Sequence, residues 1–155
     1  MFYFKQNIKT CILDYYTHNM FRWLILIVAI ITIVSAFIGW FGKKEWTKKD
    51  NLFGLLFTIF IDLQFLIGIA LYAFYSPIVK AAFNDFGAAM KNADLRFYAV
   101  EHILMMVIAI IVIHIGRAKS KKASTPVKQH RAAAIFFTIG IILILASIPW
   151  SRALM

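Results

Sequence analysis

The sequence predicts an all-α membrane protein that folds as a four-transmembrane-helix antiparallel bundle. First, 62% of the 155 residues are hydrophobic and the mean hydropathy is +0.77, whereas an ordinary globular protein is about 45–50% apolar. Second, four stretches approach or exceed the length of about 20 apolar residues that crosses a bilayer. Third, two basic polar connections and one longer connection separate these stretches. We expect a single integral membrane domain over residues 1–155.

The four predicted spans cover residues 21–41, 52–75, 96–116 and 132–148. Before the first span, apolar residues recur at helical spacing over residues 1–20, which is typical of an amphipathic segment at the membrane interface. The connection over residues 76–95 contains Phe83, Phe86 and Met90, so we expect a short surface helix there rather than a solvated loop.

The basic residues predict the orientation. The chain carries 17 Lys and Arg against 7 Asp and Glu, for a net charge of +10. Ten of these cations lie in the two connections that follow the first and third spans. The positive-inside rule places both connections in the cytoplasm and both termini on the outer side. Because the cations flank apolar spans, we expect contact with lipid and no binding of nucleic acid. Cys11 is the only cysteine, which excludes an intrachain disulfide.

The four histidines are distributed as one pair on each side of the membrane. His18 and His102 lie toward the outer side, and His114 and His130 lie toward the inner side. Two imidazoles at matching depth on facing helices are what a six-coordinate haem iron needs. We therefore predict that His18 and His102 ligate the iron of an outer haem b. His102 is the stronger candidate, because it lies deeper and beside Glu101.

A second, inner haem between His114 and His130 is one interpretation of the other pair. The alternative is that both are interfacial side chains that contact lipid head groups. His102 and His114 are 12 residues apart, which corresponds to about 18 Å of rise and about 120° around the helix axis. Two haems would therefore lie in different grooves of the bundle.

Two carboxylates lie inside the spans, where ionisable groups are functional candidates. Asp62 lies near the middle of the second span, with Gln64 two residues beyond it. Asp62 either anchors a buried hydrogen-bond network, carries a proton, or contacts a polar edge of a cofactor or quinone. Glu101 either pairs with Arg22 or Arg96 or takes part in proton chemistry.

Five strings, taken together, resemble a family of small bacterial four-helix membrane proteins filed under the name cytochrome b: THNMFRW, TIFIDLQFLIG, FGAAMKN, LRFYAVEH and ASIPW. The resemblance covers residues 18–150. It implies a membrane haem protein in electron transfer, located in the bacterial inner membrane as a multi-pass protein. By position, His18 matches the histidine before RW and His102 the histidine of AVEH. Asp62 and Gln64 match the polar pair of the second span.

The sequence thus favours a b-type cytochrome that transfers electrons between a quinol and a protein partner, rather than a classical enzyme. Its expected cofactors are one or two haem b groups, with a quinone in addition, and its expected partner is a larger membrane respiratory complex. An accessory subunit without redox chemistry is the alternative. A proton-coupled carrier that uses Asp62 is a third hypothesis.

Overall fold

The predicted fold class is confirmed by the computed structural model, which describes the backbone of residues 2–150 and the side chains of residues 16–150. Four helices in this part of the chain are long and apolar enough to cross a membrane. The elements in chain order are α1 (Phe2–Phe41), α2 (Lys48–Ala70), the π-helical turn η1 (Leu71–Tyr75), α3 (Pro77–Asn84), α4 (Phe86–Lys91), α5 (Ala93–Arg96), the π-helical turn η2 (Phe97–Glu101), α6 (His102–Lys122) and α7 (Pro126–Ala146).

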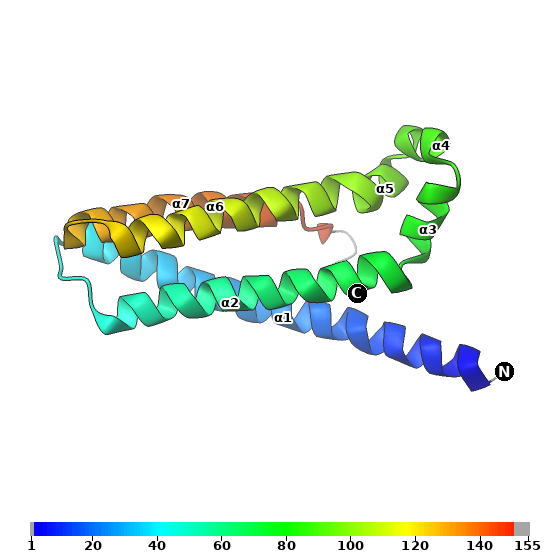
Figure 1. The fold of residues 1–155 in the computed structure, drawn as a ribbon, viewed down its shortest axis with the longest axis horizontal. Helices are drawn as coiled ribbons and strands as arrows, with labels where there is room; N and C mark the ends of the chain where they lie inside the picture. Colours follow the sequence, from blue (N-terminus) through cyan, green and yellow to red (C-terminus); the bar gives the residue numbers. More distant parts are fainter. Residues whose placement is uncertain (1, 151–155) are drawn as a thin grey trace.

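The four long helices form an antiparallel bundle in which α1 packs against α2 and α7, and α6 packs against α7 (Figure 1). The contact between α2 and α6 is the sparsest of the four neighbouring pairs. Helices α1 and α6 are therefore diagonal to each other. We call the line of contact between α2 and α6 the α2–α6 seam.

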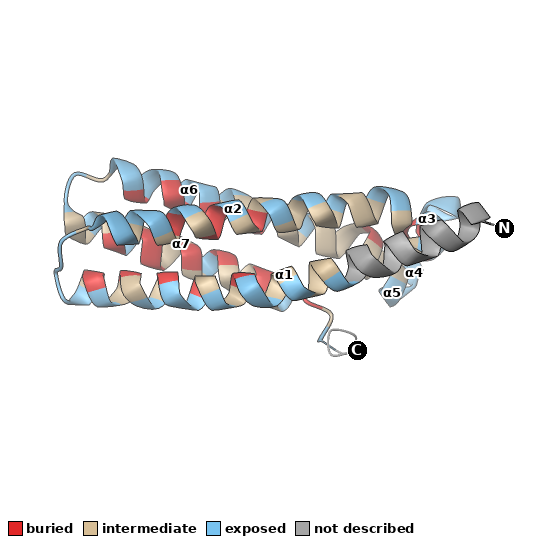
Figure 2. Cartoon of the chain, turned by 90° about the horizontal axis from the view of Figure 1, so that it is seen from below, coloured by how far each residue is buried: buried red, intermediate tan, exposed pale blue. Residues whose placement is uncertain are grey.

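The centre of the bundle is packed with small side chains and a few large ones. Small residues let transmembrane helices approach closely, and the fully buried alanines include Ala29, Ala109 and Ala134. Phe57 on α2 packs edge-to-face on Phe137 of α7, with ring centroids 5.2 Å apart. Figure 2 shows the buried residues along the inward faces of these helices, while exposed residues face outward. Large apolar side chains dominate that outward surface, as expected for helices in lipid.

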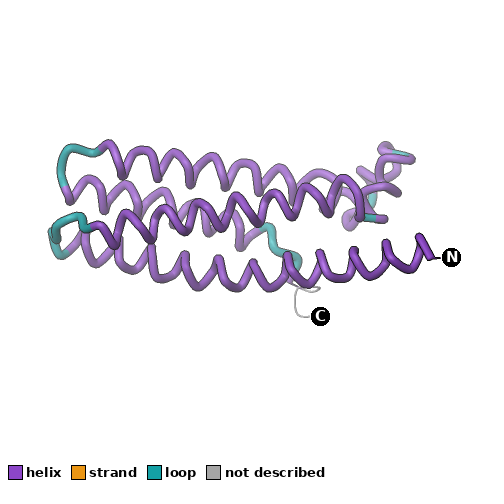
Figure 3. Tube along the Cα trace, turned by 60° about the horizontal axis from the view of Figure 1, so that its bottom comes forward, coloured by secondary structure: helices purple, strands orange, loops and turns teal. Residues whose placement is uncertain are grey.

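Two short loops join the long helices at one end of the bundle, which we call the basic end (Figure 3). At the first loop, Thr47 and Asp50 form a capping box that begins α2. At the second, Thr125 caps α7, and Pro126 occupies the first turn. The sequence had placed the third span at residues 96–116 and the fourth at 132–148, but both helices extend further into the basic connection. The reason is that this connection is rich in Ala and Lys, which are good helix formers.

The opposite end carries α3, α4 and α5, and we call it the α3–α5 end. Ser76, Asp85 and Asn92 each accept a hydrogen bond from a backbone N–H and so cap the three short helices in turn. The connection over residues 76–95 is helical rather than a loop, as expected, and it forms three short helices in place of one. The expected interfacial segment over residues 1–20 belongs to α1, which runs to Phe41 without a break. The side chains of residues 1–15 lie outside the described part of the structure.

Candidate functional site

A cavity formed by described residues lies toward the α3–α5 end, between α1, α2 and α6 and beside the C-terminal end of α7. Its volume is about 170 Å³. Most of its lining is apolar, and the polar side chains are few. The polar and aromatic lining residues are His18, Arg22, Gln64, Phe65, Tyr72, Ser76, Tyr98 and His102. A mostly apolar hollow with a few convergent polar groups is typical of a ligand site.

His18 and His102 both line this cavity, although they are 84 positions apart in the sequence. His18 comes from α1 and His102 from α6, the two diagonal helices, so the imidazoles approach the cavity from opposite corners of the bundle. The sequence predicted that these two residues share one site, and the structure brings them together in this way.

The orientation of His102 is determined by the end of α7. Its Nδ1 lies 2.9 Å from the backbone carbonyl oxygen of Ser147. A carbonyl oxygen can only accept, so Nδ1 carries the hydrogen and donates it. In the neutral imidazole this leaves Nε2 with a lone pair. Metal-binding histidines commonly show this arrangement, in which the second nitrogen donates to a carbonyl.

His18 is held differently, through its backbone and through α2. The side-chain amide of Gln64 donates a hydrogen bond of 2.9 Å to the backbone carbonyl of His18. The ring of His18 lies against Gly68, where an added Cβ would be only 3.3 Å from Cε1. Nδ1 of His18 and Oε1 of Gln64 are buried atoms that have no hydrogen-bond partner among the described residues. A buried polar atom without a partner is costly, and both atoms belong to residues that line the cavity.

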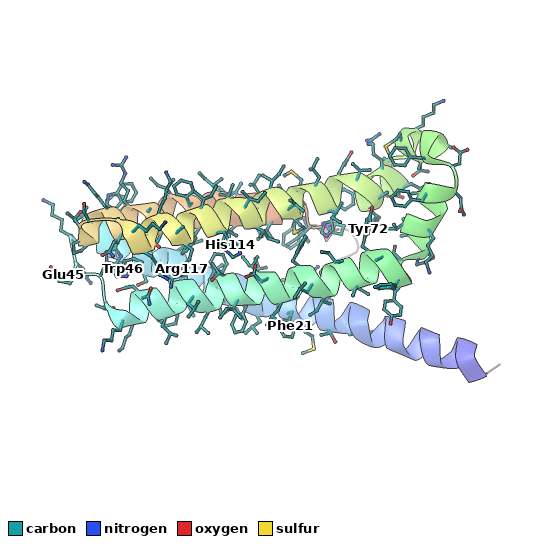
Figure 4. All side chains as sticks on the ribbon, in the orientation of Figure 1. Phe21, Glu45, Trp46, Tyr72, His114 and Arg117 are labelled. Atoms are coloured by element: carbon teal, nitrogen blue, oxygen red, sulfur yellow. The ribbon has the colours of Figure 1, made fainter. Side chains whose placement is uncertain are left out.

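Two π-helical turns flank the cavity, one at the end of α2 and one directly before His102. The hydroxyl of Tyr72 in η1 donates a hydrogen bond of 2.7 Å to the carbonyl of Ala99 in η2; Tyr72 is labelled in Figure 4. A π-helical turn widens the helix and changes the angular position of the residues that follow it, and such turns are frequent at functional sites. The turn η2 therefore influences the direction from which His102 enters the cavity.

Asp62 and His114 form a pair of their own, outside the cavity. Nε2 of His114 lies 2.8 Å from Oδ1 of Asp62. The pair joins α6 to α2, and Figure 4 shows His114 on the side of α6 that faces α2. The side chains are 47% and 45% exposed. Of the three alternatives for Asp62, the observed contact is a hydrogen-bonded pair in the α2–α6 seam rather than a contact within the cavity.

His130 is a buried packing residue and does not meet His114. It is 2% exposed, and its ring packs edge-on against Trp46 with the centroids 4.8 Å apart. Its Nε2 lies 3.3 Å from the carbonyl oxygen of Glu45. The ring occupies the space above Gly39, where even a methyl group would overlap it. The structure therefore does not bring His114 and His130 together as the ligands of an inner haem, and His130 is not a side chain that faces head groups.

Glu101 forms an ion pair with Arg96, with 2.6 Å between Oε1 and Nε. Both side chains are partly exposed, and Glu101 is not among the residues that line the cavity. Of the two alternatives for Glu101, an ion pair with arginine or proton chemistry, the observed contact is the ion pair with Arg96. A bare metal site is not evident either, because no three His, Cys, Asp or Glu side chains converge within the described residues.

Sequence reasoning missed three contributors to this site: the Ser147 carbonyl, Tyr72 and Gly68. A backbone carbonyl has no signature in a sequence. Gly68 and Tyr72 each lie in an apolar span, and the sequence alone does not show which residues of the other helices they contact. Comparison with protein-family models, with curated proteins and with solved structures found no match to this chain.

Proposed function

We propose that this chain is a membrane electron-transfer protein in which His18 and His102 hold one haem b. The observation that supports this most is the convergence of two imidazoles from diagonal helices on one cavity. The Ser147 carbonyl adds to it, because it leaves Nε2 of His102 available as a ligand atom. A bound haem would supply a one-electron carrier within the membrane.

The donor set fits an iron with two axial imidazoles. The hollow itself, at about 170 Å³, is close in size to an engineered cavity of about 150 Å³ that binds benzene. A porphyrin is larger than one six-membered ring, so its binding requires neighbouring helices to separate. The α2–α6 seam borders the cavity through Ile61 and Ile110, and this helix pair packs most sparsely.

A visible spectrum tests this proposal. The protein is purified in detergent, supplied with haem, and its reduced-minus-oxidised spectrum is recorded. We expect an α-band in the wild type and its loss in His18→Ala and in His102→Ala. His114→Gln is the matched control, because it removes an imidazole that lies outside the cavity. A wild type without an α-band, or an α-band that depends on His114, would refute the proposal.

A quinone ring is the second candidate occupant of the same cavity. The cavity volume favours it, because a single six-membered ring matches about 170 Å³. The unpartnered Oε1 of Gln64 would accept a hydrogen bond from a quinol hydroxyl. Binding of a short-chain quinol that is lost in Gln64→Leu, in a protein without an α-band, would support this candidate over haem.

We further propose that the protein lies in a bacterial inner membrane with the basic end in the cytoplasm and both termini outside. Lys43, Lys44, Lys119, Lys121 and Lys122 gather at that end, in agreement with the positive-inside rule. In a Cys11→Ser background, an impermeant maleimide applied to intact spheroplasts should label Asn84→Cys but not Lys44→Cys. Labelling of Lys44→Cys alone would indicate the opposite orientation in the membrane.

Association with a larger respiratory complex is part of the same proposal, and an accessory subunit without redox chemistry is its alternative. The small bundle with short loops supports such an association. Purification in mild detergent should retain partner subunits. A chain that is always recovered alone would contradict both the association with a respiratory complex and the accessory-subunit alternative.

A further inference from the structure

The Asp62–His114 pair lies in an unusual place for two ionisable side chains. Both residues belong to candidate membrane spans, Lys48–Tyr75 and Ala93–Lys122. Yet the side chains are 45% and 47% exposed rather than enclosed by the bundle. Ionisable groups within a membrane almost always face a protein interior or a water-filled cavity. This pair lies outside the cavity, so the single chain leaves it incompletely covered.

The surface around the pair is apolar on both helices. Ile59 and Leu66 share the face of α2 that carries Asp62, since they are three residues before it and four after it. They are 42% and 62% exposed. On α6, Ile111 is three residues before His114 and is 52% exposed. The polar pair thus lies among exposed apolar side chains along the α2–α6 seam.

The pair also has unused hydrogen-bonding capacity. Only Oδ1 of Asp62 and Nε2 of His114 are engaged, and neither residue makes another side-chain hydrogen bond to any described residue. Oδ2 of Asp62 remains an acceptor, and Nδ1 of His114 remains a second polar atom. One chain therefore presents an acceptor and an imidazole nitrogen side by side.

We propose that the α2–α6 seam is an interface with a second copy of this chain. Two copies inserted in the same orientation are related by a two-fold axis along the membrane normal, so every residue lies at the same depth in both. A second copy therefore brings its own Asp62–His114 pair to the depth of the first. Any other partner would need suitable polar groups at that same depth. When His114 is an imidazolium, both of its ring nitrogens are donors, so across the axis Nδ1–H of His114 in one copy donates to Oδ2 of Asp62 in the other.

Such a contact fits the way transmembrane helices associate. Polar side chains that hydrogen-bond across helices stabilise association in lipid, where apolar contact alone has little driving force. The dimer would also cover the polar pair and lengthen the apolar contact through Leu66 and Ile111.

Crosslinking and subunit counting in bilayers test this inference, whatever occupies the cavity. In a Cys11→Ser background, a short bifunctional thiol reagent should crosslink Leu66→Cys in one copy to Leu66→Cys in the other. Ile111→Cys should crosslink to Ile111→Cys in the same way. Ile142→Cys is the matched control, because it is 57% exposed on α7, away from the seam. Crosslinking at Ile142 in place of the seam positions would overturn the proposal, as would crosslinking of the seam to a different polypeptide.

Subunit counting by single-molecule photobleaching should show dimers in dilute liposomes. The double variant Asp62→Leu/His114→Leu should dimerise about tenfold more weakly, because hydrogen bonds on both sides of the axis are lost. Removal of both partners leaves no unpaired charge to disturb the fold. Leu66→Trp provides a second route, because it leaves the pair intact and adds bulk at the interface; it should weaken dimerisation too. A wild type that is monomeric, or dimers that both variants leave unchanged, would exclude the interface.

Discussion

His102 and Ser147 are joined by a hydrogen bond of 2.9 Å from Nδ1–H of the imidazole to the backbone carbonyl of Ser147. The bond exists because α7 ends at Ala146, which frees the last carbonyls of the helix from intrahelical partners. The end of one transmembrane helix thus determines the orientation of a side chain on its neighbour. The same contact places the ring of His102 at the edge of the cavity.

The first prediction concerns the tautomers of two histidines. His102 should carry its hydrogen on Nδ1, whereas His130 should carry it on Nε2, which faces the carbonyl of Glu45. Solid-state ¹⁵N spectra of histidine-labelled protein in bilayers distinguish the two nitrogens. The signals are assigned by their loss in His102→Ala and His130→Ala. Protonation of His102 on Nε2 alone would contradict the proposed ligand geometry.

The second prediction concerns Gly68 and the fit of His18. In Gly68→Ala the new methyl group would lie 3.3 Å from Cε1 of His18, which is tighter than an ordinary contact, so the ring must shift. If His18 ligates a haem as proposed, haem occupancy, measured as α-band absorbance per protein, should fall several-fold. Gly54→Ala on the same helix is the control, because its nearest neighbours would be 3.7 Å away. Equal occupancy in the two variants would show that Gly68 does not position His18.

The third prediction concerns the close contact between α1 and α7. In Gly39→Ala the added methyl group would overlap the buried ring of His130. Overpacking of this kind costs about 1–3 kcal/mol, so we expect a clearly lower thermal unfolding temperature in detergent. Gly87→Ala in α4 should leave the unfolding temperature unchanged, since the added methyl group would lie 3.6 Å from its nearest neighbour, Oδ1 of Asp85. An unchanged unfolding temperature in Gly39→Ala would mean that His130 does not pack as described.

The fourth prediction concerns the link between the two π-helical turns. Tyr72→Phe removes the hydrogen bond of 2.7 Å to Ala99, and one such bond contributes about 1 kcal/mol. Hydrogen exchange in the η2 turn should rise several-fold in the variant. Tyr75→Phe is a suitable control, because Tyr75 lies in the same turn and makes no side-chain hydrogen bond to a described residue. Equal exchange in both variants would argue that the link is not stabilising.

Much of the fold follows from the sequence, because each long helix is specified by local features. Runs of apolar residues of bilayer length predicted the helices, and the capping box of Thr47 and Asp50 is the local feature that begins α2. The helix ends were less accurate. The basic connection after the third span was expected to be a loop, yet α6 continues to Lys122. Lysine is a good helix former, and its positive charge interacts favourably with the last turn of a helix.

The candidate site was predictable only in part. Depth in the membrane is a one-dimensional property, so the sequence placed His18 and His102 at a common level. Depth also suggested a pairing of His114 with His130, but the structure directs His114 toward Asp62 and His130 toward Trp46. Depth alone does not say which helices are neighbours or which faces meet.

By itself, therefore, the sequence determined the number of spans, their apolar character and the approximate depth of each polar group, since these depend on local composition. The tertiary structure decided the partners: α1 diagonal to α6, Asp62 beside His114, and the Ser147 carbonyl beside His102. The physical reason is that partner choice depends on helix order and rotation. These arise from the packing of side chains far apart in the chain, such as Gly39 against His130.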